Sequence, residues 1–211
     1  MSQTCHKLHH LFNSLPLFGF PFDMAKIPKN GLYILFENGE YGHESNRIVR
    51  IGTHTGNNQL PSRLQQHFIR ENKDRSIFRK NIGRALLNRA KDPYFAIWEL
   101  DLTTREAKKK YSNLIDSVKQ KQVEQQVTNV IQGNFHFIVF RVESKEKRLE
   151  LESKIISTVS SCSQCKPSEN WFGRYSPKDK IRESGLWLIN GLYKTQLSEE
   201  EFSQLEGEIK G

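Results

Sequence analysis

The stretch GLYILFE at residues 31–37, followed by RIVRIG at residues 47–52, decides the fold of this chain. Both stretches are rich in aliphatic and aromatic residues with alternating positions, which predicts two β-strands. The polar residues between them, 38–46, begin with Asn-Gly and predict a loop. We therefore expect an antiparallel pair joined by this loop. Strict alternation along the second strand places Ile48 and Arg50 on one face.

Helical patterns surround this strand pair. Pro61 suits the first turn of a helix that ends near Arg70, with apolar residues at every fourth position. The remaining pattern predicts helices at residues 4–12, 77–90, 106–131 (one helix or two), 144–159, near 181 and after a capping box at 198–201, and strands at 94–102 and 135–142. We expect one α/β domain: a small central antiparallel or mixed β-sheet flanked by helices, with inserted helices and a C-terminal extension.

The composition is that of a basic, soluble protein. The 211 residues carry a formal net charge of +8, and no run approaches the ~20 apolar residues of a membrane span. Residues 1–22 lack an apolar run followed by a small-residue cleavage site, so we expect no secretory signal and a cytoplasmic location.

Positive charge is concentrated between Arg70 and Lys91, where eight Lys or Arg residues stand against two acids. Helical periodicity over residues 77–90 leaves four of them on the outer face: Arg79, Lys80, Arg84 and Arg89. Such a cluster is the electrostatic footprint of a nucleic-acid-binding surface.

The three cysteines argue against a disulfide framework, because their number is odd, and they fit a reducing cytoplasm. Cys162 and Cys165 form a CxxC pair. A zinc site would need a second pair of ligands, and only the group of His6, His9 and His10 near Cys5 offers one. The simpler interpretation is that two small residues occupy a tight turn after a helix.

Glu152 lies within the apolar stripe of the helix expected at residues 144–159, three residues after Leu149 and four before Ile156. An ionised carboxylate on a core-facing surface is costly unless it is paired or binds a metal. Two interpretations stand: an ion pair with an inward arginine, or a metal ligand in a cleft. Magnesium commonly takes one or two protein carboxylates and completes its shell with phosphate and water.

Other polar residues are unspecific when each is taken alone. Arg63 and His67 are four residues apart and project from the same side of a helix, as a solvated surface pair also would. Tyr33 is an ordinary strand residue, and Asn170 before a tryptophan can cap a turn.

Taken together and in order, these residues resemble the GIY-YIG nuclease family, over about residues 27–171. Members pair two strands that carry the name-giving tripeptides, and then place an Arg, often with a His four residues on, in the first helix. A Glu in a later helix and an Asn after a Pro complete the pattern. The matching positions are Gly31-Leu32-Tyr33, Arg50-Ile51-Gly52, Arg63, His67, Glu152 and Asn170.

The resemblance implies a metal-dependent DNA endonuclease with one Mg²⁺ or Mn²⁺ per active site, held by Glu152. Arg63 would bind the scissile phosphate, and Tyr33 would position or activate the attacking water. His67 would assist proton transfer or bond the phosphate, and Asn170 would orient the phosphate. Arg50 departs from the family pattern, which usually has Tyr there, and would bind phosphate or place positive charge beside Tyr33.

Alternatives remain open at this stage: an inactive domain that only binds nucleic acid, or a nuclease specific for DNA structure or for RNA. The expected partner is duplex DNA, in a restriction, repair or mobile-element role, and a homodimer would allow both strands to be cut. We expect a lead-in at residues 1–26 and a catalytic domain at 27–175 with a helical insertion at about 77–131. A C-terminal extension at 176–211 would pack on the same domain.

Overall fold

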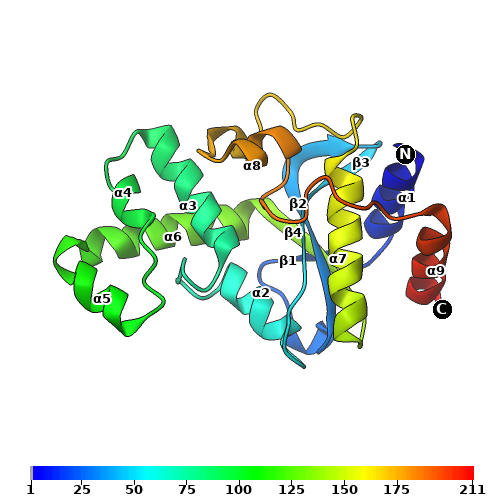
Figure 1. Ribbon diagram of the computed structural model, residues 1–211, viewed down its shortest axis with the longest axis horizontal. Helices are drawn as coiled ribbons and strands as arrows, with labels where there is room; N and C mark the ends of the chain where they lie inside the picture. The colour runs from blue at the N-terminus through cyan, green and yellow to red at the C-terminus, as the bar shows by residue number, and fades with distance from the viewer. Residues whose placement is uncertain (1) are drawn as a thin grey trace.

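The computed structural model describes residues 2–211 and shows a four-stranded antiparallel sheet in the order β1-β4-β2-β3 (Figure 1). The strands are β1 (Phe18–Gly19), β2 (Gly31–Gly42), β3 (Ser45–Gly52) and β4 (Phe135–Arg141). The expected fold class and the antiparallel β2–β3 pair are confirmed. The expected loop at residues 38–46 is wrong, because β2 continues to Gly42 and the hairpin turns at His43 and Glu44.

Nine α-helices are assigned within residues 2–211: α1 (Ser2–Asn13), α2 (Leu60–Phe68), α3 (Ile77–Ala90), α4 (Phe95–Trp98), α5 (Arg105–Tyr111), α6 (Ser117–Asn134), α7 (Lys145–Ser160), α8 (Asp179–Ser184) and α9 (Glu199–Lys210). Three 3₁₀ turns accompany them: η1 (Met24–Lys26), η2 (Ser112–Leu114) and η3 (Phe172–Tyr175). The capping box of Ser198 and Glu201 is present at the start of α9. No helix in this part of the chain is long and apolar enough to cross a membrane.

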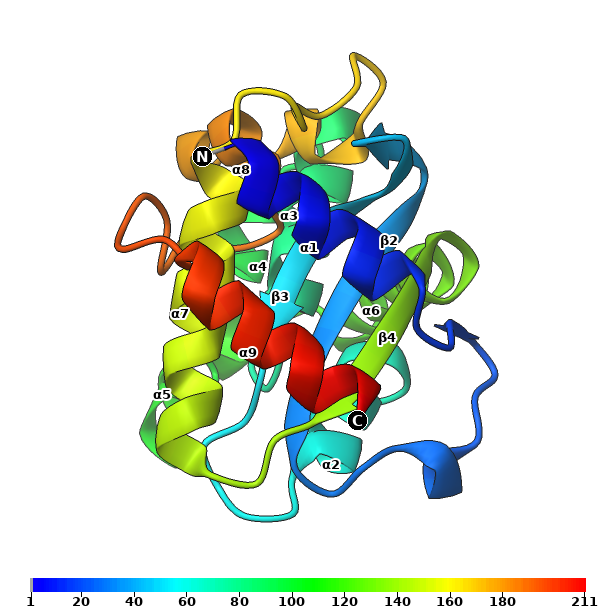
Figure 2. The same cartoon turned by 90° about the vertical axis from the view of Figure 1, so that its right-hand side faces the viewer.

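The sheet separates two hydrophobic cores. Leu32 and Ile34 point into the core beneath α1, α7 and α9, whereas Tyr33 and Leu35 point into the core beneath α2, α3 and α6. Figure 2 shows α1 and α9 lying across the first face of the sheet with α7 beside them. Alternation along β2 assigns successive side chains to opposite faces, so the active-site candidate Tyr33 belongs to the face covered by α2 and α3.

A β-bulge in β3 changes the faces that simple alternation predicts. Phe36 pairs with Ile48 and Leu35 pairs with Arg50, so Val49 is an extra residue. Ile48 therefore lies in the core of α1, while Arg50 lies on the Tyr33 side. The expectation that Ile48 and Arg50 share a face is wrong. The carbonyl of the bulged Val49 accepts a hydrogen bond from the backbone N–H of Trp187, at 2.7 Å.

Residues 95–98 form the short helix α4, so the strand expected at 94–102 is wrong. A turn at Asp92 precedes this helix, and the Asp92 carboxylate accepts a hydrogen bond from the backbone N–H of Tyr94 at 2.9 Å. The indole N–H of Trp98 then donates to the carbonyl of Lys80 at 3.0 Å. A Cβ at Gly83 would lie 2.3 Å from the Trp98 ring, so the close approach of α4 to α3 requires glycine there.

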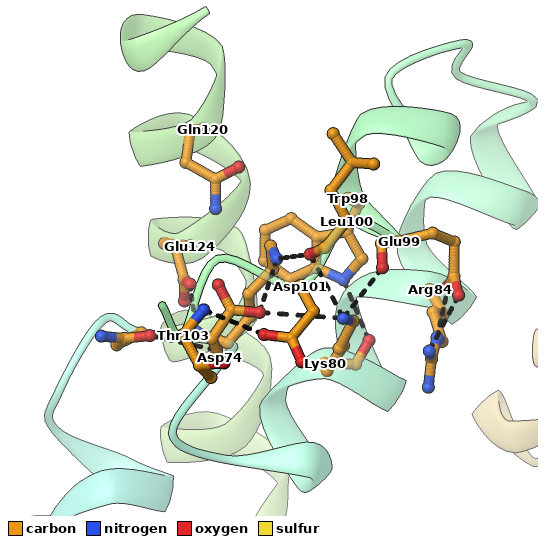
Figure 3. Close-up of polar contacts among 12 residues, drawn as sticks. Asp74, Lys80, Arg84, Trp98, Glu99, Leu100, Asp101, Thr103, Gln120 and Glu124 are labelled. Carbon is orange, nitrogen blue, oxygen red and sulfur yellow. Dashed lines mark hydrogen bonds and ion pairs between the residues drawn. The ribbon is translucent and has the colours of Figure 1, made fainter. Parts of the chain in front are cut away.

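The basic residues of α3 are mostly buried, and the expectation that they point outward is wrong for Arg79, Lys80 and Arg84. Arg79 forms a two-pronged ion pair with Glu124 of α6, at 2.8 and 3.1 Å. Figure 3 shows Lys80 and Arg84 directed at the segment that follows α4, where Lys80 donates to the carbonyl of Glu99 and Arg84 pairs with its carboxylate. The helix packs against α4, α6 and η3, so these three cations bind the protein itself, whereas Arg89 is exposed.

Candidate active site

Two glycines allow the strands to place Tyr33. Tyr33 lies directly opposite Gly52 in the β2–β3 pair, and a Cβ at Gly52 would stand 2.2 Å from the tyrosine hydroxyl. On the other edge of β2, a Cβ at Gly31 would stand 2.1 Å from the carbonyl oxygen of Phe140. Both positions lack room for any side chain, which gives a packing reason for a glycine in each tripeptide.

A buried chain of hydrogen bonds leads from Arg50 through Tyr33 to His67. The Nε of Arg50 donates to the Tyr33 hydroxyl at 3.4 Å, and that hydroxyl bonds Nε2 of His67 at 2.8 Å. The other ring nitrogen, Nδ1, bonds the hydroxyl of Ser76 at 2.7 Å. Tyr33 and His67 are fully buried, so His67 is not the solvated residue that its helix position allowed.

His67 is held neutral. Burial lowers the pKa of its imidazole well below the ordinary value, and the positive charges of Arg63, Arg50 and Arg79 lower it further. A neutral imidazole has one donor and one acceptor nitrogen, which matches its two hydroxyl partners. The arrangement therefore fixes the ring and the Tyr33 hydroxyl in one orientation.

Glu152 projects from α7 towards the end of β3. Its Oε1 accepts from the backbone N–H of Thr53 at 3.1 Å. Burial raises the pKa of this carboxyl, while Arg50, the Thr53 N–H and Arg63 oppose the rise. Within residues 2–211, no lysine or arginine forms an ion pair with Glu152. The buried arginine pair considered from the sequence is thus not the arrangement found.

The stripe around Glu152 differs from the expected one. Leu149 is 37% exposed and does not belong to the core-facing side of α7. The buried apolar positions are instead Leu151, Ile155, Ile156 and Val159. Glu152 lies at the margin of this stripe and is half-buried, because it borders a cleft.

Two clefts lie on either side of the hydrogen bond between Thr53 and Glu152. The first has a volume of about 400 Å³ and brings together Arg50, Glu152 and Asn190 with apolar residues of β3 and of the segment after Trp187. The second, about 310 Å³, is lined by Thr53 and Arg63 among others. The hydrogen bond from Thr53 to Glu152 links the two linings. Arg63 is oriented by bonds to the side chain of Gln66 and the carbonyl of Arg75, both at 3.0 Å.

Asn170 is not part of this arrangement. It is exposed and lines a different cleft with Glu37, Glu40 and the exposed Arg89. The asparagine that lines the Glu152 cleft is Asn190, which the sequence analysis missed. Its signal was an Asn-Gly pair directly after the apolar run at 186–189, the same turn signal that was recognised at residues 38–39.

Thr53 and Ser76 were also missed. Thr53 fixes the site twice, by its N–H to Glu152 and by its hydroxyl to the carbonyl of Gly31 at 2.7 Å. Ser76 caps α3 by accepting from the N–H of Arg79 at 3.2 Å, while it bonds His67. A serine before an expected helix was a visible capping signal, but its bond to His67 depends on how α2 and α3 pack.

A family model described as a GIY-YIG domain matches residues 17–211, nearly the whole chain. The protein therefore belongs to the GIY-YIG family, whose members are generally nucleases. The match extends over both the helices between residues 77 and 131 and the C-terminal segment. Comparisons with curated proteins and with solved structures give no match.

Glu152 fits the divalent metal that such nucleases typically use. One carboxylate oxygen is engaged by the Thr53 N–H, and no cationic side chain of residues 2–211 pairs with the group. A single carboxylate at the wall of a cleft meets the preference of magnesium, which keeps phosphate and water among its ligands.

Proposed function

We propose that this protein is a metal-dependent DNA endonuclease that hydrolyses phosphodiester bonds in the Glu152 cleft, with Mg²⁺ or Mn²⁺ as the ion. The observation that supports this most strongly is the unpaired, half-buried carboxylate of Glu152, in one cleft with Arg50 and Asn190. A partly buried carboxylate that forms no ion pair with the arginines near it is suited to hold a metal cation.

In this proposal Glu152 holds the ion, and the Thr53 N–H keeps the carboxylate oriented. A bound divalent ion would supply positive charge to the phosphate oxygens as negative charge develops on them. Arg50, on the same cleft wall, would bind a non-bridging oxygen of the phosphate with its planar donors. Arg63 would hold the neighbouring part of the DNA backbone from the second cleft.

Tyr33 and His67 would act from beneath the cleft. The Tyr33 hydroxyl is fully buried and contacts Arg50, so its role would be to orient that guanidinium group. Its burial gives no support to direct activation of water by Tyr33. His67 would hold the hydroxyl in place through its bond at 2.8 Å. Asn190 would take the phosphate-orienting role first expected of Asn170.

Glu152→Gln tests this function, because the amide keeps an oxygen for the Thr53 N–H and removes the charge that would hold the ion. With a supercoiled plasmid and Mg²⁺, we expect cleavage to fall by roughly 10³-fold or more, while DNA binding without metal is retained. Glu150→Gln is the matched control, since Glu150 is an exposed residue of the same helix that pairs with Lys154.

Two results would contradict the proposal. Wild-type protein that binds DNA without nicking it in Mg²⁺ or Mn²⁺ would favour an inactive binding domain. Equal cleavage by the Glu152→Gln and Glu150→Gln proteins would remove Glu152 from the site. Cutting confined to flaps, bubbles or RNA would change the substrate class and leave the metal role in place.

A further inference from the structure

The three cysteines and one histidine gather away from the Glu152 cleft. The ligand atoms of Cys5, His43, Cys162 and Cys165 all lie within 4.8 Å of one another. They come from α1, from the β2–β3 turn and from the loop after α7, and Figures 1 and 2 both show the start of α1 beside the C-terminal end of α7. The three thiols are buried.

Two distances between these atoms are close to the edges of a tetrahedral metal site. The Sγ atoms of Cys5 and Cys165 are 3.6 Å apart, and Sγ of Cys162 is 3.4 Å from Nε2 of His43. A tetrahedron with zinc–sulfur bonds of about 2.3 Å and zinc–nitrogen bonds of about 2.0–2.1 Å has edges of roughly 3.5–3.8 Å. A disulfide would need sulfur atoms about 2.05 Å apart.

The backbone around His43 supports a role for this side chain. His43 and Glu44 form the hairpin turn with φ angles of +52° and +60°, a conformation that turns of this type usually give to Asn or Gly. A histidine there accepts a backbone cost and directs its ring towards the cysteines. The adjacent Gly42 permits the close approach, since a Cβ at that position would lie 3.0 Å from the Cβ of Cys165.

The other histidines of this region bond backbone groups or each other, although Nδ1 of His9 also lies 3.7 Å from Sγ of Cys5. His9 is buried, with Nδ1 bonded to the carbonyl of Cys5 at 2.9 Å and Nε2 accepting from the N–H of Ile48 at 3.2 Å. His6 and His10 bond each other at 3.1 Å on the exposed side of α1. The sequence analysis looked for the second ligand pair in the group of His6, His9 and His10 near Cys5. The histidine that lies with the three cysteines is instead His43, and His9 positions α1 against β3.

We propose that Cys5, His43, Cys162 and Cys165 bind one structural Zn²⁺ ion. Four protein ligands close the coordination shell, which is the arrangement of structural rather than catalytic zinc. Binding would release the three thiol protons to solvent, with no change in oxidation state. The complex of three thiolates and Zn²⁺ carries one net negative charge, and Arg47 and Lys166 lie close enough to Cys165 to favour it.

The ion would join three segments that are distant in the sequence. It would hold α1 and the loop after α7 against the hairpin end at which β3 begins, while Arg50 lies near the other end of β3. Its role would be to stabilise the fold, and it is independent of the proposed nuclease chemistry at Glu152.

Metal analysis of the full-length protein, purified under reducing conditions, tests the site. We expect about one zinc per chain, and Co²⁺ substitution should give the absorption bands of a tetrahedral thiolate site. His43→Asn removes the ligand but suits the positive φ, so the turn should persist and zinc content should fall to below about a tenth. Glu44→Asn in the same turn is the matched control and should retain the metal.

The proposal fails if the folded wild-type protein holds no zinc after incubation with Zn²⁺ and all three thiols react with a thiol reagent. It also fails if mass spectrometry finds a disulfide between two of the cysteines in the reduced preparation. Equal zinc content in the His43→Asn and Glu44→Asn proteins would exclude His43 as a ligand. Because metal content is the readout, an inactive nuclease would not affect this test.

Discussion

The side chains of the candidate site are positioned by contacts with residues that are distant in the sequence. Arg50 on β3 bonds both the Tyr33 hydroxyl and the carbonyl of Trp187, so one guanidinium connects β2 to the C-terminal segment. Three residues on, Thr53 holds Glu152 from α7. The second tripeptide thus contributes a cation to the cleft where the usual family residue is Tyr, and its glycine makes room for Tyr33.

The two asparagines give a prediction at this scale. Asn190→Ala should lower cleavage by roughly 10- to 100-fold, because the residue shares the cleft with Arg50 and Glu152. Asn170→Ala should leave the rate within about twofold, since Asn170 lies in another cleft. Single-turnover rates of both variants on one DNA substrate would decide, and the reverse order of effects would restore Asn170 to the site.

At the scale of elements, two buried glutamates near the end of β2, Glu37 and Glu40, hold the C-terminal segment in place. In the β2–β3 pair, residues 37–40 stand opposite the single residue Arg47, and Glu37 and Glu40 are both buried. The indole N–H groups of Trp171 and Trp187 both donate to Glu37, each at 2.8 Å. Glu40 pairs with Arg47. These buried acids anchor irregular segments that are not strands of the sheet.

Glu37 should make stability depend on pH. Burial raises the pKa of its carboxyl from 4.5 to about 7 in the folded protein. A carboxyl group with a raised pKa makes its full contribution to stability at pH values below its pKa in the unfolded chain. This contribution is lost as pH rises from about 4.5 to about 7. Glu37→Gln should remove this pH dependence. The difference in free energy of unfolding between wild type and variant should therefore change by on the order of 3 kcal/mol over this pH range.

Urea unfolding of both proteins at several pH values measures the effect. The comparison must use the difference between wild type and variant, because other buried carboxyls such as Glu124 also have raised pKa values. Parallel pH profiles would show that Glu37 titrates alike in the folded and unfolded states.

At the scale of the whole molecule, the net charge of +8 remains the argument for a polyanionic partner, although α3 supplies few of the free cations. We expect DNA affinity to fall steeply with salt, as counterion release requires. Arg89→Gln should lower the slope of log affinity against log salt by about one, because Arg89 is the exposed cation among the four expected on α3.

Lys210→Gln is the matched control for that measurement. Lys210 is also exposed, but it ends α9 on the opposite side of the sheet from α3. Fluorescence anisotropy with a labelled duplex at several salt concentrations gives both slopes. If Lys210→Gln lowers the slope of log affinity against log salt and Arg89→Gln does not, DNA binds on the α9 side of the sheet and the assignment to the α3 side is wrong.

Features that depend on neighbouring residues could be predicted from the sequence. The β2–β3 pair, the helices at 60–68, 77–90 and 145–160, and the final capping box follow from periodicity and local hydrogen bonding. Glu152 was also singled out as a candidate, since a carboxylate in an apolar helical pattern is a local anomaly, although Leu149 proved to be exposed. Its role stays a prediction.

The amino-acid sequence alone therefore determined the strand pair, most of the helices and the family motif, because each depends on short-range patterns. It failed at α4, where a strand was predicted. Only the tertiary structure decided that a bulge turns Arg50 towards Tyr33, that Arg79 pairs with Glu124, and that Asn190 lines the cleft. It alone brought His43 to cysteines from α1 and from the loop after α7. The physical reason is that such contacts join residues tens to more than a hundred positions apart, and packing of whole elements fixes them.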